Sequence, residues 1–266
     1  MSFLRQTMAL CLALAAAAAW AQTPPYPSFQ VQSSPSLQAA ARQLAALINR
    51  DRMAQGIRPL QWDPALAEAA RRHCWRMVEE GTIAHRYDDE PSLSNRAAEA
   101  GARFSLIEEN VAVGPDPSAI ETAWMHSPGH RANLLNPGID RVGAAAVADH
   151  GVLYAVADFA RAVPALTREQ VEAAIASLVR VSGVAVLPDP AAARAACSTD
   201  QGVPTSISGV LPRFIMRWQG SDLNRLPGDL AEKLASGSYR QAAIGSCPPH
   251  EEQGGFTAYR VAVLLY

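Results

Sequence analysis

The stretch 142–159 constrains the fold more than any other part of this sequence. Two apolar runs, 142–148 and 152–159, flank the turn sequence Asp149-His150-Gly151. Apolar runs joined by a short glycine-containing turn are typical of antiparallel hairpins. Because helical patterns precede this hairpin, the order of elements predicts an α+β fold.

Amphipathic helices are predicted at 37–48 and 66–78, where apolar residues recur at helical spacing. The second begins after Asp63-Pro64, an N-cap followed by a first-turn proline, and stops at Gly81. Ser118 and Glu121 have the spacing of a capping box, which predicts a third helix through Trp124. A short strand is expected at 109–114.

A second, smaller α+β unit is predicted after Pro164, which interrupts the strand pattern. Thr167 and Gln170 predict a capped helix. Strand patterns follow at 213–218, 239–245 and 256–266, with a helix near 229–235. No repeat with a period of 20 to 50 residues occurs in the sequence. The predicted domains are therefore 37–163 and 164–266.

The N-terminus has the pattern of an export signal. Arg5 precedes a short apolar run that ends in Ala19-Trp20-Ala21, which predicts a signal peptide at 1–21. The alternative is a membrane anchor, but the run is short for a bilayer, and no later segment is apolar enough to span one. An extended leader is expected at 22–36. We therefore expect a secreted or periplasmic protein that does not span the membrane.

Three cysteines remain after removal of a signal peptide. Cys74 lies in an apolar helical pattern, where a buried thiol is the common role. Cys197 and Cys247 lie in loop-like sequence, and disulfides persist outside the cytoplasm. These two are the disulfide candidate, which would stabilise the fold by roughly 4 kcal/mol in the chain-entropy model.

Charge and motifs exclude several classes of protein. The 23 basic and 25 acidic residues give a formal net charge of -2, so a basic nucleic-acid binder is excluded. The sequence contains no GxSxG, HExxH, GxxxxGK[ST] or CxxC motif. Standard serine hydrolases, zincins, P-loop enzymes and thioredoxin-like sites are therefore not expected.

An ordered succession of motifs covers residues 37–162. At these motifs the sequence resembles the CAP superfamily of cysteine-rich secretory proteins, antigen 5 and pathogenesis-related proteins, in its bacterial SCP-domain form. The motifs are Ile48-Asn49-Arg50-Asp51-Arg52, Pro59-Leu60-Gln61-Trp62-Asp63, His85, Glu109-Asn110-Val111-Ala112, the run from Trp124 to Leu135, Val142-Gly143 and Asp158-Phe159-Ala160.

The resemblance implies a CAP-like α-β-α sandwich with a central antiparallel sheet and a cleft that holds two histidines and two acidic residues. The histidines match His85 and His130, and one acidic residue matches Glu109. Ser127 stands where many eukaryotic members have the second glutamate, so the tetrad is incomplete.

Two neutral imidazoles can hold a zinc ion, and a nearby carboxylate can accept a proton from a bound water. His85 and His130 are therefore the candidate metal ligands, Glu109 the candidate general base, and Ser127 a hydroxyl that could face a substrate. Since catalytic zinc usually has three protein ligands, we expect at most a weakly held divalent ion. We also expect the cleft to be lined, or its loops to be fixed, by Asn110, Arg131 and Asn133.

We expect the cleft to bind a small molecule, a lipid or a peptide or cell-wall ligand. Two alternatives stay open: a metal-dependent extracytoplasmic peptidase or other hydrolase, and a protein-interaction module whose partner the C-terminal unit selects. A buried hydrogen-bond network without a ligand would use the same residue types. The oligomeric state is open at this point.

Overall fold

The computed structural model describes residues 35–204, 210–250 and 253–266. The predicted signal peptide at 1–21 and most of the predicted leader lie outside this range. The leader predicted at 22–36 overlaps α1 (Pro35–Ala54), which begins two residues before the predicted helix start at 37. Proline is favoured in the first turn of a helix, which accounts for this start.

The first sheet contains four strands in the order β1-β3-β4-β2. These strands are β1 (Gln61–Trp62), β2 (Phe104–Gly114), β3 (Arg141–Asp149) and β4 (Val152–Ala162). β3 and β4 form the predicted hairpin around His150 and Gly151, and both turn residues have a positive φ. The sheet is antiparallel apart from the two-residue pairing of β1 with β3.

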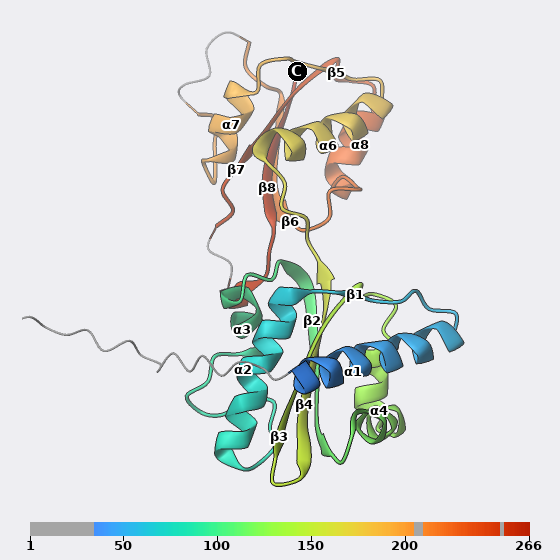
Figure 1. The fold of residues 1–266 in the computed structure, drawn as a ribbon. Coiled ribbons are helices and arrows are strands. Elements are labelled where there is room, and N and C mark those ends of the chain that lie inside the picture. The colour runs from blue at the N-terminus through green and yellow to red at the C-terminus, as the bar shows by residue number, and fades with distance from the viewer. Residues whose placement is uncertain (1–34, 205–209, 251–252) are drawn as a thin grey trace, which may run out of the picture. The chain divides into compact units, whose positions relative to one another are not determined.

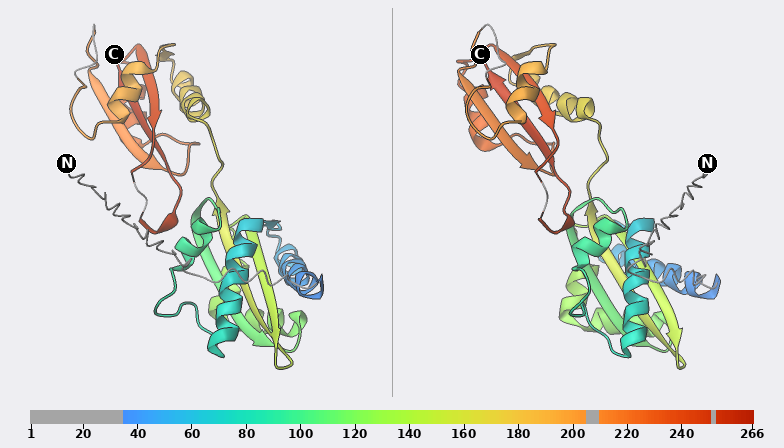
Figure 2. Two further views of the ribbon diagram at one scale, coloured as in Figure 1. Left: turned by 60° about the vertical axis from the view of Figure 1, so that its left-hand side comes forward. Right: turned by 90° about the vertical axis from the view of Figure 1, so that its left-hand side faces the viewer.

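Helices cover both faces of this sheet (Figures 1 and 2). On one face, Ile48 of α1, Trp124 of α4 (Pro117–His126) and Leu134 of α5 (Pro128–Leu134) pack against Phe159. On the other, α2 (Pro64–Glu80) and α3 (Leu93–Glu99) pack on alternate strand residues. The predicted α-β-α sandwich is confirmed.

Two local predictions in this part were wrong. The capping box at Ser118 does not form, because Asp116 is the N-cap of α4 and accepts the N–H groups of Ser118 and Ala119. The strand expected at 109–114 begins earlier, at Phe104. Its charged first half breaks the apolar alternation, but pairing with β4 along its length holds it in the sheet.

The second sheet has the order β5-β7-β8-β6 and draws on residues 185–265 alone. Its strands are β5 (Ala185–Val186), β6 (Phe214–Gly220), β7 (Gln241–Cys247) and β8 (Tyr259–Leu265). The helices of this part are α6 (Arg168–Val181), α7 (Ala191–Cys197) and α8 (Gly228–Ala235), and η1 (Gln253–Gly255) is a short 3-10 turn. The predicted C-terminal α+β composition and the Thr167–Gln170 capping box are confirmed.

The two sheets share one connectivity. In each, a two-residue first strand pairs in parallel with the third strand, and the fourth strand lies antiparallel between the third and the second. Each sheet also has a glycine directly under a helix, because a Cβ at Gly143 or at Gly245 would overlap the backbone of the helix packed on it. This repeat spans about 100 residues, which a search for periods of 20 to 50 residues does not detect. The domain boundary at 163/164 stays a prediction.

The cysteines behave as expected. Cys197 and Cys247 form a disulfide with a Cα–Cα distance of 5.8 Å. Cys74 is free and buried in the core under α2, and burial raises the pKa of its thiol to about 12.

Candidate functional site

His85 and His130 lie next to each other, although 44 residues separate them in the sequence. Their ring centroids are 6.3 Å apart and the ring planes are tilted by 49°. His85 belongs to the loop after α2, and His130 is the third residue of α5. The fold therefore brings together the two histidines that the sequence singled out.

Glu109 holds the ring of His85 from the middle of β2. Its Oε1 is 2.9 Å from Nδ1 of His85, and the carboxylate is buried while the His85 ring is largely exposed. The hydrogen bond to Glu109 raises the pKa of His85. Burial, and then the positive charge of His85, lower the pKa of His130. The pKa values of the two neighbouring imidazoles are therefore shifted in opposite directions.

Arg96 of α3 pairs with the second oxygen of Glu109. Its Nη2 lies 2.5 Å from Oε2, and both side chains are at most 5% exposed. Arg96 also reaches Glu90, whose Oε1 is 2.6 Å from Nδ1 of the buried His73. Arg96 and Glu90 could not be identified from the sequence, because neither lies in a pattern that marks burial. Glu109 is thus held on one oxygen by His85 and on the other by Arg96.

Asp158 adds a second buried carboxyl group behind the site. It is directly opposite Glu109 in the pairing of β2 with β4, and both of its oxygens are buried without a hydrogen-bond partner among the described residues. Burial, followed by the charge of Glu109, raises the pKa of Asp158 well above its ordinary value. The neutral acid is therefore favoured. An aspartate inside an apolar strand was the signal that could have identified it.

Asn110 and Asn133 fix the backbone that carries His130. Asn110 is fully buried and donates from Nδ2 to the carbonyl oxygen of His130 at 3.0 Å. Asn133 donates to Asn110 Oδ1 at 2.9 Å and to the carbonyl oxygen of Glu109 at 3.2 Å. These bonds tie α5 to β2. Arg131 is exposed and makes no such bond within the described chain.

Ser127 lies at the junction between α4 and α5. It is half-buried, and its side chain makes no capping bond to α5. No hydrogen bond joins its hydroxyl to His85, Glu109 or His130 in the described residues. Pro128 starts a new helix after it, so His126 and His130 do not share a helix.

The donor set does not fit a committed zinc site. Within the residues that the structure describes, no group of three or more His, Cys, Asp or Glu side chains is arranged to hold a metal ion. Glu109 is already engaged by Arg96 and His85, so His85 Nε2 and the His130 ring are the remaining donors. Two imidazoles fall short of the three protein ligands usual for catalytic zinc.

The family model that matches this chain covers the residues of this site. The model of the family described as CAP, cysteine-rich secretory protein family, matches residues 45–159. The uncharacterized protein YkwD of Bacillus subtilis is 32% identical over 109 residues, which is 41% of this chain and 42% of YkwD. The uncharacterized membrane protein YlbC of the same organism is 34% identical over 104 residues, or 38% of this chain and 30% of YlbC.

A solved structure is similar to part of the chain. An extracellular SCP-domain protein from Bacillus anthracis shares 28% identity with a TM-score of 0.44, covering 47% of this chain and 41% of that one. The matches span less than half the length of these three relatives. Residues 45–159 of this chain are therefore a CAP domain, matched by the model of the cysteine-rich secretory protein family.

Proposed function

We propose that the CAP domain binds a polar ligand between His85 and His130. The observation that carries this proposal is that two imidazoles with ring centroids 6.3 Å apart have pKa values shifted in opposite directions. Around neutral pH, Glu109 favours the protonated form of His85, which donates a hydrogen bond, while His130 favours the neutral form, which can accept one. The pair suits a ligand that offers both an acceptor oxygen and a donor.

A weakly held divalent ion belongs to the same proposal. Two imidazole donors can bind Zn²⁺ when both are neutral, but Glu109 stabilises the protonated form of His85 and so competes with the metal. Asn110 and Asn133 keep the His130 ring in place through the α5 backbone. We therefore infer metal affinity well below that of a resident zinc site.

Calorimetric titration with Zn²⁺ tests this arrangement. We expect weak binding by the chain from Gln22 and loss of the signal in His85→Ala/His130→Ala. His126→Ala is the matched control, because His126 is exposed and its ring bonds to the carbonyl oxygen of Thr122 in its own helix. Equal Zn²⁺ binding by the double variant and the control would remove the metal part of the proposal.

A hydrolase is the second candidate, favoured by the same separation of pKa values. Pairs of titratable groups with pKa values shifted apart often act as acid and base. His130 would be the base and His85 the acid, with Glu109 positioning His85, because Glu109 is already bonded to Arg96 and His85. Turnover of fluorescein-labelled casein that is abolished by His130→Ala would support this candidate.

We also propose that the protein acts outside the cytoplasm. The Cys197–Cys247 disulfide supports this, because structural disulfides persist mainly in oxidising compartments. The signal-like sequence at 1–21 points the same way. No helix among the described residues is long and apolar enough to cross a membrane.

A further inference from the structure

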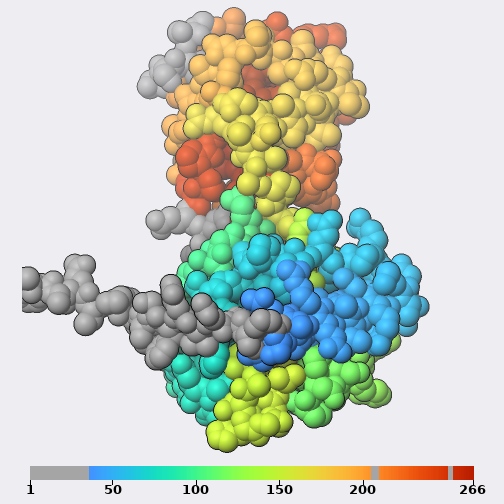
Figure 3. All heavy atoms as spheres, in the orientation of Figure 1, coloured from blue at the N-terminus to red at the C-terminus, as the bar shows by residue number. Residues whose placement is uncertain are grey.

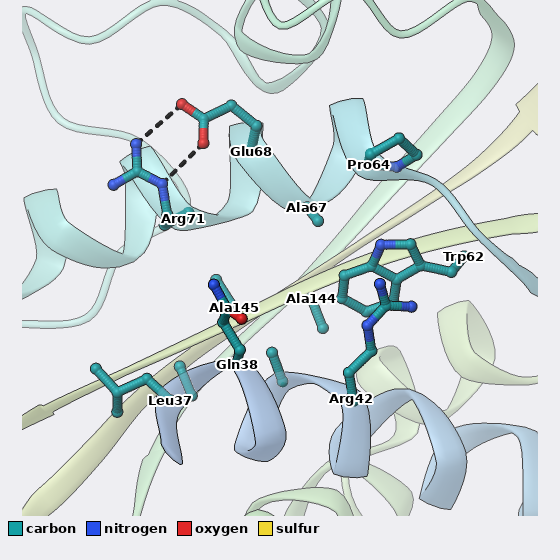
Figure 4. Close-up of a pocket in the computed structure, with 12 residues that line it drawn as sticks. Leu37, Gln38, Arg42, Trp62, Pro64, Ala67, Glu68, Arg71, Ala144 and Ala145 are labelled. Carbon is teal, nitrogen blue, oxygen red and sulfur yellow. Dashed lines mark hydrogen bonds and ion pairs between the residues drawn. The ribbon is translucent and has the colours of Figure 1, made fainter. Parts of the chain in front are cut away.

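A groove of about 380 Å³ lies between α1 and α2 and contains none of the residues of the histidine site. Residues 144–146 of β3 form its floor, and the two helices form its walls (Figure 4). Both helices are at the surface in the space-filling view of Figure 3, in blue and cyan. The volume is within the range of small-ligand sites.

The floor of this groove is an open strand edge. β1 pairs with β3 only as far as Val142, and beyond it no described strand continues on that side. Asp63 donates its N–H to the carbonyl oxygen of Val142, so Val142 points its backbone groups away from β4. Because these groups alternate along a strand, Ala144 and Ala146 also direct theirs into the groove.

The second sheet shows the same edge in a closed form. Leu187 donates its N–H to the carbonyl oxygen of Ala242 in β7, just as Asp63 does to Val142 in β3. Ser246 follows Ala242 by four residues and therefore corresponds to Ala146. The N–H of Ser246 donates to Oε1 of Glu172 in α6 at 2.9 Å. A carboxylate from the neighbouring helix thus occupies the outward hydrogen-bonding position of β7.

Arg194 of α7 holds that carboxylate in place. It donates from Nε to Glu172 Oε1 and from Nη2 to Oε2, both at 2.8 Å. Asp63 and Asp189 are alike, because each accepts the N–H group two residues further on. Glu68 of α2 and Arg194 of α7 each lie five residues after these aspartates, so they occupy the same position relative to them. The charge at this helix position is therefore reversed between the two units.

The CAP domain supplies no such carboxylate to its own open edge. Glu68 pairs with Arg71 on the same helix, and the groove-lining residues of α1 include no acid. Arg42 of α1 lies over the ring of Trp62 at 3.8 Å, as Figure 4 shows. The lining thus carries two guanidinium groups, from Arg42 and Arg71, and one carboxylate, from Glu68. Its excess positive charge complements an anionic occupant.

We propose that this groove binds an extended peptide through its C-terminal carboxylate, in the position that Glu172 occupies in the second unit. Two outward N–H and C=O pairs, on Ala144 and Ala146, are spaced by about 6.6 Å along the strand and match an extended backbone. The carboxylate then accepts from the N–H of Ala146 and pairs with the guanidinium groups. The partner is a peptide chain end, added as a strand to β3.

Nuclear magnetic resonance of the ¹⁵N-labelled chain from Gln22 tests the proposal. The probe is a degenerate pool of acetylated hexapeptides with free C-terminal carboxylates, compared with the same pool as C-terminal amides. We expect the amide signals of Ala144 and Ala146 to shift and to exchange more slowly with solvent. The carboxylate pool should bind about tenfold more tightly than the amide pool, since charge-assisted hydrogen bonds are the stronger ones.

Two variants separate the groove from a general effect of charge. Gln38→Glu places a carboxylate on α1 in the groove with almost no change of shape, and should weaken binding of the carboxylate pool about fivefold or more. Glu172→Gln, in the second unit, should leave it unchanged. The proposal is overturned by equal binding of the two pools, by unchanged binding in Gln38→Glu, or by absence of shifts at Ala144 and Ala146 up to about 5 mM peptide. Shifts that depend on protein concentration without peptide would assign the edge to a second copy and also overturn it.

Discussion

Arg96 and Glu109 form a buried ion pair at the centre of the CAP domain, with Nη2 2.5 Å from Oε2. The pair joins α3 to β2, and His85 receives the remaining oxygen of Glu109. Removal of one partner of a buried pair leaves an uncompensated charge, which is costly in a low-dielectric interior. The orientation and charge of His85 thus depend on a residue outside the family motifs noted in the sequence.

Loss of Arg96 should destabilise the fold strongly. We expect Arg96→Met to lower the free energy of unfolding by about 3–5 kcal/mol, measured by urea denaturation at pH 7. Arg72→Ala is the control, because Arg72 is half exposed and its pair with Glu68 should contribute at most about 1 kcal/mol. Similar stabilities for the two variants would contradict the importance of the buried pair.

Much of the CAP domain was predictable because its local signals agree with its tertiary structure. Asp63-Pro64 and Gly81 delimit α2 as expected, and the turn at His150-Gly151 sets the hairpin. The partners of His85 were harder to predict, since Arg96 and Asp158 acquire their role only when α3 and β4 pack beside β2. Spacing along the chain carries no information about such contacts.

Glu121 should make stability fall as pH rises. It is buried in α4, and burial followed by the hydrogen bond to Asp51 raises its pKa to about 7 from an ordinary 4.5. An acid with a raised folded pKa binds protons preferentially in the folded state, so stability is lost between about pH 4.5 and 7.

We expect Glu121→Gln to be more stable than the parent by about 1–3 kcal/mol at pH 8, and to differ little near pH 4.5. Denaturant unfolding at the two pH values measures this. Glu79→Gln, at an exposed position of α2, should change stability by less than about 0.5 kcal/mol at both. A Glu121→Gln effect that is independent of pH would count against a raised pKa.

The disulfide should be the main covalent support of the C-terminal unit. The free energy of unfolding should fall by about 2–5 kcal/mol in Cys197→Ala/Cys247→Ala, since the bridge links residues 50 apart.

Thiol counting gives an independent measurement on the chain from Gln22. We expect one thiol, that of Cys74, to react after denaturation and almost none before, because it is fully buried. Three reactive thiols in the denatured protein would exclude the bridge.

The predicted boundary at 163/164 can be tested by expression of 22–163 alone. The first sheet uses only residues 61–162 and has helices on both faces, so this fragment should unfold cooperatively. Its amide spectrum should retain the signals of β3 at their positions in the full chain. A collapsed, poorly dispersed spectrum would place the boundary elsewhere.

Glu109 raises the pKa of His85 while burial lowers the pKa of His130, and histidine titration by nuclear magnetic resonance measures both values. We predict a pKa above 6.5 for His85 and below 6.5 for His130. The His85–Glu109 bond would stabilise the fold below about pH 6.5, and this contribution would be lost as pH rises through the raised pKa. In Glu109→Gln, the pKa of His85 should fall toward 6.5. A His130 pKa at or above that of His85, or no change of the His85 pKa in Glu109→Gln, would contradict the role of Glu109 in raising the His85 pKa.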